Sequence, residues 1–241
     1  MDMGSSDKTR SFTIQLAVSR AGLAIWVGIA SGFLVLTGCA HLFKDNMIYD
    51  LLDYPGPTRT SPSQVPDTLM VYRFLLAPSV DSYSLVITKS AGKEQSLAKH
   101  RWNHSPADMI TDLIQRDLDR AGPFSRAVSQ FSNVSYRYSL EGKIVELHGL
   151  ERKGKIFAVL KVEVVLTDFE APPGGNKTVL KQNYSVETPC RDSEPNSVVQ
   201  GLVKGTQEFS ERLLRDVTAA LRQSRPDSLK SPGSPPSKVE T

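Results

Sequence analysis

Residues 156–169 read IFAVLKVEVVLTDF, and this alternating stretch decides the predicted fold. Apolar residues occupy every second position: Ala158, Leu160, Val162, Val164 and Leu166. A period of two is typical of a β-strand with one face buried and the other face in water. The stretch therefore predicts a long strand in a sheet that has a single buried face.

The segments on either side of this strand repeat the alternation. Residues 136–144 carry apolar side chains at even numbers, and residues 179–188 follow the same period. Gly149 and Gly154 lie in the first join, and Pro-Pro-Gly-Gly at residues 172–175 lies in the second. Because Gly and Pro favour turns, the three strands are predicted to form an antiparallel meander.

Shorter strands are predicted earlier in the chain. Four segments combine β-branched or aromatic residues with flanking turn residues: Ile48–Tyr54, Met70–Leu76, Tyr83–Thr88 and Phe124–Val128. The first of these is expected to be an edge strand. Between the third segment and Trp102, residues 90–99 are rich in Gly, Lys, Glu and Gln, and they predict a long polar loop.

One helix has the clearest signal in the chain. Ser105 is a favoured N-cap residue, Pro106 suits the first helical position, and Asp108 is placed to answer the cap. Apolar residues then recur at helical spacing: Ile110, Leu113, Ile114, Leu118 and Ala121. Gly122 and Pro123 end the pattern, and Gly122 is expected to adopt the left-handed conformation beyond the helix.

A second helix is predicted from about Pro195 to Leu221. Its apolar stripe is made by Val199, Leu202, Val203, Thr206, Phe209, Leu213, Val217 and Leu221. Two such helices can both cover the buried face of one sheet. The predicted fold class is α/β, a sandwich of a largely antiparallel mixed sheet with two long helices packed on one face.

The start of the chain carries an export signal. A leader with three basic residues precedes an uncharged apolar run from Ala21 to Leu36, and small residues follow. This order is typical of a secretory signal peptide. The exit, Leu36-Thr37-Gly38-Cys39, resembles the bacterial lipobox. That resemblance implies cleavage after Gly38, a diacylglycerol on the Cys39 sulfur and acylation of the new amino group, which together anchor the chain to a membrane.

A membrane-spanning helix is the alternative interpretation of the same run. The run has 16 residues, three of them glycines, whereas a span needs about 20 apolar residues. Either Met1 or Met3 can be the true start. Ala40 after the cysteine resembles the pattern of outer-membrane sorting, which implies an anchor on the periplasmic face of the outer membrane.

Composition limits the remaining possibilities. Removing residues 1–38 leaves 203 residues and changes the net charge from +3 to +2. The sequence has no cluster of basic residues of the kind that predicts binding to nucleic acid. We predict four parts: a signal peptide at 1–38, a lipidated tether at 39–66, one domain at 67–222 and a disordered Ser/Pro-rich tail at 223–241.

No set of residues predicts catalysis or metal binding. With Cys39 acylated, Cys190 is the remaining thiol, and it is interpreted as a buried small residue because no base accompanies it. His100 and His104 have a spacing that binds metals on helices, but the predicted helix begins after them. We therefore predict no catalytic residue, no cofactor, no metal site and no enzyme activity.

Three stretches behind the lipobox resemble one family. They are Tyr49–Tyr54 with the strand Val71–Pro78, the segment from His100 through Ser105-Pro106 to Phe124, and Tyr138–Ile144 with the long strand ending at Asp168 and the last helix. Their order resembles the ABC-type transport auxiliary lipoprotein family, the PqiC-like group, over residues 48–221. The polar loop at 90–99 and the C-terminal tail depart from that pattern.

The resemblance implies an accessory or docking lipoprotein in a system that moves lipids between membranes. Its implied partners are a periplasmic MCE-domain protein and an ABC transporter or inner-membrane partner, and a homo-oligomer is a further option. The alternatives are a carrier that holds an acyl chain between sheet and helices, and a hydrolase. Trp102 is interpreted either as a core anchor or as an exposed aromatic that contacts a partner.

Overall fold

The computed structural model describes residues 46–51, 54–58, 65–89, 92–171 and 177–224. The predicted signal peptide, Cys39 and residues 225–241 of the tail lie outside these residues. The strands are β1 (Met47–Tyr49), β2 (Thr68–Val71), β3 (Leu75–Leu76), β4 (Ser84–Thr88), β5 (Glu94–Trp102), β6 (Arg126–Ser129), β7 (Tyr138–Arg152), β8 (Lys155–Asp168) and β9 (Thr178–Pro189). The helices are α2 (Pro106–Ala121) and α3 (Pro195–Ser224).

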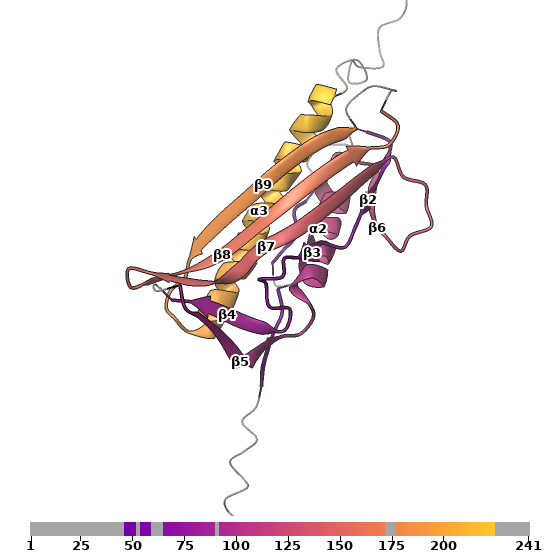
Figure 1. Ribbon diagram of the computed structural model, residues 1–241. Helices are drawn as coiled ribbons and strands as arrows, with labels where there is room; N and C mark the ends of the chain where they lie inside the picture. Colours follow the sequence, from indigo (N-terminus) through magenta and orange to yellow (C-terminus); the bar gives the residue numbers. More distant parts are fainter. Residues whose placement is uncertain (1–45, 52–53, 59–64, 90–91, 172–176, 225–241) are drawn as a thin grey trace, which may run out of the picture. The chain divides into compact units, whose positions relative to one another are not determined.

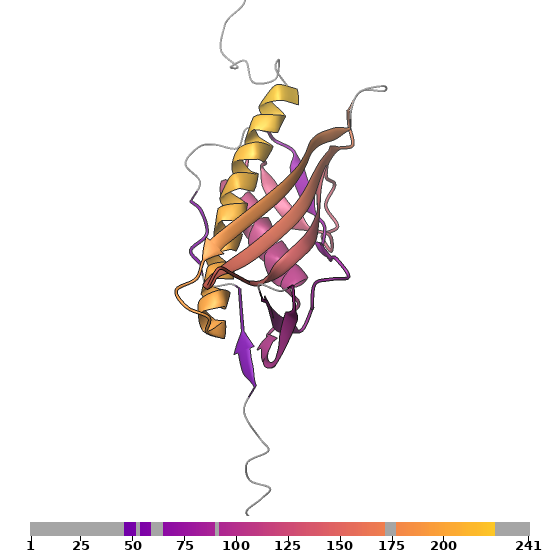
Figure 2. The same ribbon diagram turned by 60° about the vertical axis from the view of Figure 1, so that its left-hand side comes forward.

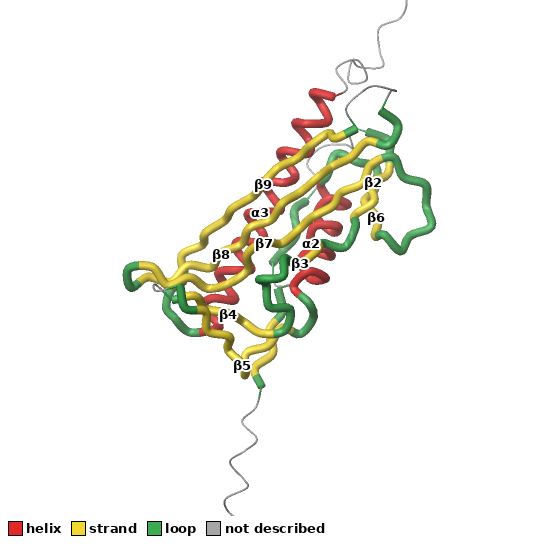
Figure 3. Tube along the Cα trace, viewed as in Figure 1, coloured by secondary structure: helices red, strands yellow, loops and turns green. Residues whose placement is uncertain are grey.

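Strand β7 organises one mixed sheet (Figures 1 and 3). Along one edge β7 pairs antiparallel with β8 over its full length, and β9 pairs antiparallel with β8. The other edge of β7 is shared by β2, β3 and β4, which pair with it in parallel one after another. Strand β5 adds antiparallel to β4, β1 adds parallel to β5, and β6 adds parallel to β2.

Both helices cover the same face of this sheet, as Figure 2 shows. Helix α3 packs on β8 and β9, while α2 packs on β6 and against α3. The predicted stripe of α3 is buried except for Val203, which is half-buried. The five alternating residues of β8 are also buried. The predicted fold class is confirmed: the long strands are antiparallel, the short ones make the sheet mixed, and two helices pack on one face.

The join between β7 and β8 is shorter than predicted. Strand β7 continues to Arg152, so Gly149 lies inside it and not in a turn. A Cβ at Gly149 would lie 3.1 Å from Val198 of α3, which explains the small residue there. The turn itself is Lys153-Gly154, with φ angles of 53° and 71°. Two positive φ angles match the type I′ turn that suits the twist of a hairpin.

The predicted polar loop at residues 90–99 is wrong over most of its length. Strand β5 begins at Glu94 and forms a hairpin with β4, in which Val86 pairs with Ser96. Most of the described side chains in the first half of β5 are exposed, so their polarity resembles that of a loop. Leu97 packs against the core and is the one large apolar residue between Glu94 and Ala98. Strand β5 forms because it pairs with β4, and the sequence pattern of β5 alone does not indicate that pairing.

The ends of α2 also differ from expectation. Ser105 precedes the helix, but its side chain makes no capping hydrogen bond, and Asp108 pairs with Arg73 of the β2–β3 connection. Gly122 is extended, with φ −68° and ψ 168°. The left-handed prediction fails because Pro123 follows, and a residue before proline is driven to extended backbone. A Cβ at Gly122 would lie 2.3 Å from the Leu118 carbonyl oxygen, so glycine is still required.

A buried carboxylate fixes the beginning of the fold. Asp117 of α2 is fully buried and accepts hydrogen bonds from the Tyr54 hydroxyl (2.7 Å) and the Ser210 hydroxyl of α3 (2.6 Å). Arg116 lies over the Tyr54 ring, 4.7 Å from its centre, and donates to Asp117. Leu51 is also fully buried. The middle of the predicted tether, residues 39–66, is therefore attached to the core through α2.

Candidate partner-docking site

The connection between β2 and β3 contains a bulge. Val71 pairs with Leu140, and Leu75 pairs with Lys143. Four steps along this connection therefore face three steps along β7, so one residue is extra. A bulge of this kind breaks the alternation and re-aims the side chains after it. The single strand predicted at Met70–Leu76 is wrong for this reason.

The bulge turns Phe74 inward and Leu75 outward. Phe74 is fully buried and lies over Gly142 of β7, where a Cβ would sit only 2.5 Å from the ring. Leu75 has 64% of its surface exposed. The backbone N–H groups released by the bulge find side-chain acceptors, because Phe74 N donates to Thr111 Oγ1 (2.9 Å) and Arg73 N donates to Gln130 Oε1 (3.0 Å).

A hollow of about 490 Å³ lies on the sheet face that the helices leave uncovered. We call it the outer-face groove. Its lining residues come from the bulge, from the loop after β6 and from β7 and β8: Tyr72, Arg73, Leu75, Gln130, Glu141, Gly142, Lys143, Glu163 and Val165. Both signs of charge are present. The groove therefore combines apolar surface from Tyr72, Leu75 and Val165 with charged side chains, a mixture that protein interfaces also show.

Aromatic side chains extend the groove toward the end of β8. The hydroxyls of Tyr72 and Tyr136 are 2.9 Å apart, and the Tyr136 ring meets the Phe169 ring edge-on at 5.8 Å. Phe131 follows Gln130 of the groove and has 82% of its surface exposed. We call these four aromatic residues and Leu75 the outer-face patch. Large exposed apolar patches on sheet faces mark interaction sites.

Ion pairs hold both ends of the patch. Arg73 pairs with Asp108 of α2, and this hydrogen-bonded contact lowers the pKa of Asp108. Beside Phe169, Arg137 donates two hydrogen bonds of 2.8 Å to Asp168. Burial raises the pKa of Asp168, but the bonds from Arg137 and from the Glu170 backbone outweigh it, so the pKa is lowered overall. Both aspartates are therefore ionised at neutral pH.

Trp102 lies in the core and not on this patch. Only 7% of its surface is exposed, as the core-anchor interpretation expects. His100 stacks on Tyr49 and shares a hydrogen bond of 3.0 Å with its hydroxyl. Within the described residues, no three His, Cys, Asp or Glu side chains gather into a metal site. A role for Trp102 in partner contact stays a prediction.

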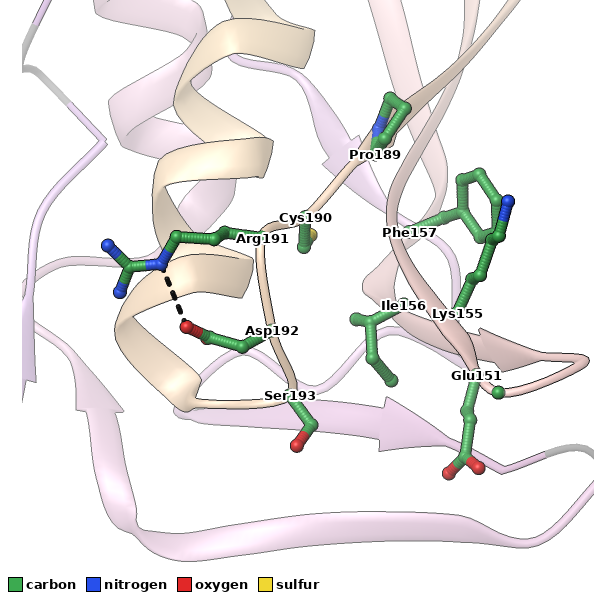
Figure 4. A pocket seen from close by; sticks show the side chains of 10 residues that line it. Glu151, Lys155, Ile156, Phe157, Pro189, Cys190, Arg191, Asp192 and Ser193 are labelled. Carbon is green, nitrogen blue, oxygen red and sulfur yellow. Dashed lines mark hydrogen bonds and ion pairs between the residues drawn. The ribbon is translucent and has the colours of Figure 1, made fainter.

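Cys190 lines a second hollow, of about 650 Å³, where β8 begins and β9 ends (Figure 4). Its thiol is half-buried, and burial raises its pKa. Reactive thiols need a lowered pKa, so this environment favours the structural interpretation. The charged side chains around the hollow are Glu151, Lys155, Arg191 and Asp192, and Arg191 pairs with its neighbour Asp192.

The carrier alternative requires an apolar cavity between sheet and helices. The large side chains at that interface include Phe74, Phe124, Tyr138 and Phe209, and all four are fully buried. Phe124 lies against Tyr138, and Phe209 lies against Tyr184. The outer-face groove, by contrast, lies on the opposite side of the sheet. The buried interface is thus packed with aromatic rings, which gives the carrier no support.

Comparisons with known proteins agree with this architecture. A profile of the ABC-type transport auxiliary lipoprotein component matches residues 49–214. A crystal structure of a Xanthomonas campestris protein of family DUF330 is similar at 15% identity and a TM-score of 0.64, covering 75% of this chain and 99% of that one. A second crystal structure, of an uncharacterized protein, reaches a TM-score of 0.55 at 15% identity, with 72% and 99% covered. No curated protein matches the chain.

The chain belongs to the ABC-type transport auxiliary lipoprotein family. The match spans most of the described fold, from β1 to α3. This family is defined by a transport role and not by an enzymatic one. Among the residues that the structure describes, neither helix is long and apolar enough to cross a membrane.

Proposed function

We propose that the protein is an accessory lipoprotein of an MCE-type ABC system that moves lipids between membranes. Cys39 carries the acyl anchor, and Ala40 directs the chain to the periplasmic face of the outer membrane. Residues 1–38 are the signal peptide, residues 39–66 the tether, residues 67–222 the domain and residues 223–241 the tail. The family match supports the transport role, and the lipobox supports the address.

The outer-face patch is the surface that docks the partner. One observation carries this assignment: the bulge leaves Leu75 exposed on a sheet face that lacks helical cover, beside the outer-face groove and an exposed Phe131. Aromatic anchors over a groove are where interface energy concentrates. The partner is a periplasmic MCE-domain protein, which links this lipoprotein to the ABC transporter or inner-membrane partner.

Co-purification from membranes tests the docking surface. The lipoprotein is expressed together with an MCE-domain protein that a neighbouring gene encodes. Leu75→Asp and Phe131→Asp are each expected to reduce recovery of this partner by at least about tenfold. The reason is that a hot-spot residue of an interface contributes about 2 kcal/mol or more. Ala219→Asp is the control, because Ala219 is exposed on α3, which covers the opposite face of the sheet. Unchanged recovery with both patch variants would reject the surface.

Trp102→Ala separates the two interpretations of that residue. Because its side chain is buried, the variant is expected to lower the melting temperature strongly and to bind the partner normally while it remains folded. A variant that melts like the parent but loses the partner would instead make Trp102 a direct contact.

Mass spectrometry of the native protein tests the anchor: an unmodified Cys39 with an intact leader removes both the address and the transport role.

A further inference from the structure

A second exposed apolar region lies at the sheet edge where the described fold begins. Met47 and Ile48 of β1 have 52% and 66% of their surfaces exposed, and Tyr83, just before β4, has 75%. Polar side chains usually protect an edge strand, so a three-residue edge strand with two exposed apolar residues calls for a neighbour. This region is separate from the outer-face patch.

The register places these residues on three adjacent strands. Ile48 pairs with Arg101 of β5, and Arg101 pairs with Ser84 of β4. Trp102 N donates to Tyr83 O (2.9 Å) on one side of β5, and Asn103 N donates to Tyr49 O (2.8 Å) on the other. The exposed side chains of Lys99 and Arg101 therefore stand among the exposed apolar ones.

A hollow continues the apolar surface from β1 to α3. It measures about 420 Å³, and its lining combines the apolar Ile48, Val199 and Val203 with Tyr49, Asp50, Asn196 and Gln200. On the β4 side, the carboxylate of Asp81 accepts from the backbone N–H groups of Tyr83 and Ser84. The half-buried Asp50 follows β1. The surface thus combines apolar side chains with the exposed Lys99 and Arg101, and the carboxylates of Asp50 and Asp81 lie at its border.

Chain length ties this edge to the predicted anchor. Cys39 precedes Met47 by eight residues, and eight extended residues span at most about 29 Å. Directly after β1, the buried Leu51 and the Tyr54–Asp117 hydrogen bond attach the chain to the core. An acylated Cys39 would therefore hold this edge of the domain close to the bilayer, whichever way the intervening residues run.

We propose that Met47, Ile48, Tyr83, Lys99 and Arg101 form a bilayer-facing corner that rests on the leaflet carrying the lipid anchor. This inference depends on the proposed lipidation of Cys39. Aliphatic side chains enter the boundary between headgroups and acyl chains, Tyr favours the headgroup level, and Lys and Arg reach anionic phosphates. The acyl chains hold the protein on the membrane, and the corner sets its orientation.

The orientation has a consequence for docking. Strand β4 joins β7 near the β7–β8 turn, where Ile87 pairs with Gly149, whereas Phe169 follows the far end of β8 (Figure 1). The thirteen steps from Lys155 to Asp168, at about 3.3 Å each, separate the two ends by roughly 43 Å. A corner on the bilayer directs the Phe169 end of the outer-face patch away from it.

Site-specific fluorescence on the full-length lipoprotein tests the corner. An environment-sensitive dye is attached to Ile48→Cys in a Cys190→Ala background, where the acylated sulfur of Cys39 cannot react. The protein is reconstituted into vesicles of phosphatidylethanolamine and phosphatidylglycerol that contain nitroxide-labelled lipid. The expected result is an emission shift to shorter wavelength and quenching by the nitroxide. Tyr83→Cys provides a second label position if the first variant melts below its parent.

The control is Leu75→Cys, because Leu75 and Ile48 are almost equally exposed, at 64% and 66%. Its dye is expected to remain in water without a shift or quenching. Replacing phosphatidylglycerol by phosphatidylcholine, or Lys99 by Glu, is expected to weaken quenching at position 48. Equal signals at positions 48 and 75, with Cys39 shown by mass spectrometry to be acylated, would overturn the corner alone. An unmodified Cys39 would overturn the proposed function as well.

Discussion

At Gly142, the missing side chain lets the ring of Phe74 lie directly against β7. The same contact positions the bulge and keeps Leu75 on the outer face. Thr111 completes the arrangement, because its hydroxyl accepts from Phe74 N and donates to the Ala107 carbonyl within α2 (2.6 Å). A single glycine therefore connects the packing of the core with the shape of the outer-face groove.

Gly142→Ala is expected to destabilise the fold by about 1–3 kcal/mol, the usual cost of overpacking a filled core. The added Cβ would approach the Phe74 ring to 2.5 Å, and the buried ring has no room to move. Urea unfolding followed by circular dichroism measures the change. Adding Phe74→Leu should recover part of the loss, since the smaller side chain frees space. Identical unfolding midpoints for Gly142→Ala and its parent would contradict the contact.

At the scale of elements, an ion pair between Arg137 and Asp168 joins β7 to β8 where β7 begins and β8 ends. We call this ion pair the clasp. Tyr138 pairs with Asp168 across the ladder, and Arg137 just before β7 holds the Asp168 carboxylate with two hydrogen bonds. The Arg137 side chain is 17% exposed and that of Asp168 is 11% exposed. A shielded two-bond pair of this kind stabilises more than a solvent-exposed ion pair does.

The clasp predicts a pH dependence. The pKa of Asp168 is lower in the folded chain than its ordinary value of 3.8, so its contribution to stability is present above that value and is lost as the pH falls through the folded pKa. Asp168→Asn is expected to lower the free energy of unfolding at pH 7 by about 2–3 kcal/mol. The variant should also lose part of the stability change seen on acidification, which unfolding experiments at neutral and acid pH measure.

The exposed pair of Arg152 and Glu187 is the control for this clasp. Its side chains are 51% and 37% exposed, although the nitrogen–oxygen distance is the same, 2.8 Å. Glu187→Gln is expected to change the free energy of unfolding by less than about 1 kcal/mol. Equal effects of the Asp168 and Glu187 substitutions would show that burial does not set the strength of these pairs.

For the molecule as a whole, the fold closes only when the last helix docks. Helix α3 follows every strand in the chain, yet it covers the buried faces of β8 and β9. It also supplies Ser210 to the carboxylate of Asp117, 93 residues earlier. The core therefore depends on contacts between α3 and earlier parts of the chain, which can form only after α3 has been synthesised.

Ending the chain before Val199 is expected to leave an insoluble, aggregating sheet. The truncation exposes the apolar faces of β8 and β9, and a sheet face of that size does not stay soluble without cover. Solubility after lysis and a thermal melt of any soluble fraction measure the outcome. A chain ending at Ser224 keeps every described element and should melt like the parent. Soluble, cooperatively melting protein from the shorter chain would refute this dependence.

Local patterns were sufficient for the long elements β8, α2 and α3 and for the side of each that is buried. The alternation in residues 156–169 predicted β8 and its inner face, and the stripes at helical spacing predicted α2 and α3, because a strand or helix repeats its exposure at its own period. The lipobox is likewise a contiguous motif, readable without a fold. These features depend on neighbours in sequence, so the sequence by itself determined the layers and the family.

Only the tertiary structure decided the register, and with it the candidate surfaces. The pairing of Leu75 with Lys143, one position earlier than an unbroken strand would reach, depends on Phe74 finding space over Gly142, 68 residues away. Strand β5 likewise forms because β4 supplies its partner. A shift of one residue reverses the face of every side chain beyond it. Contacts between residues far apart in the sequence set this shift of register, so the local periodicity of one strand cannot predict it.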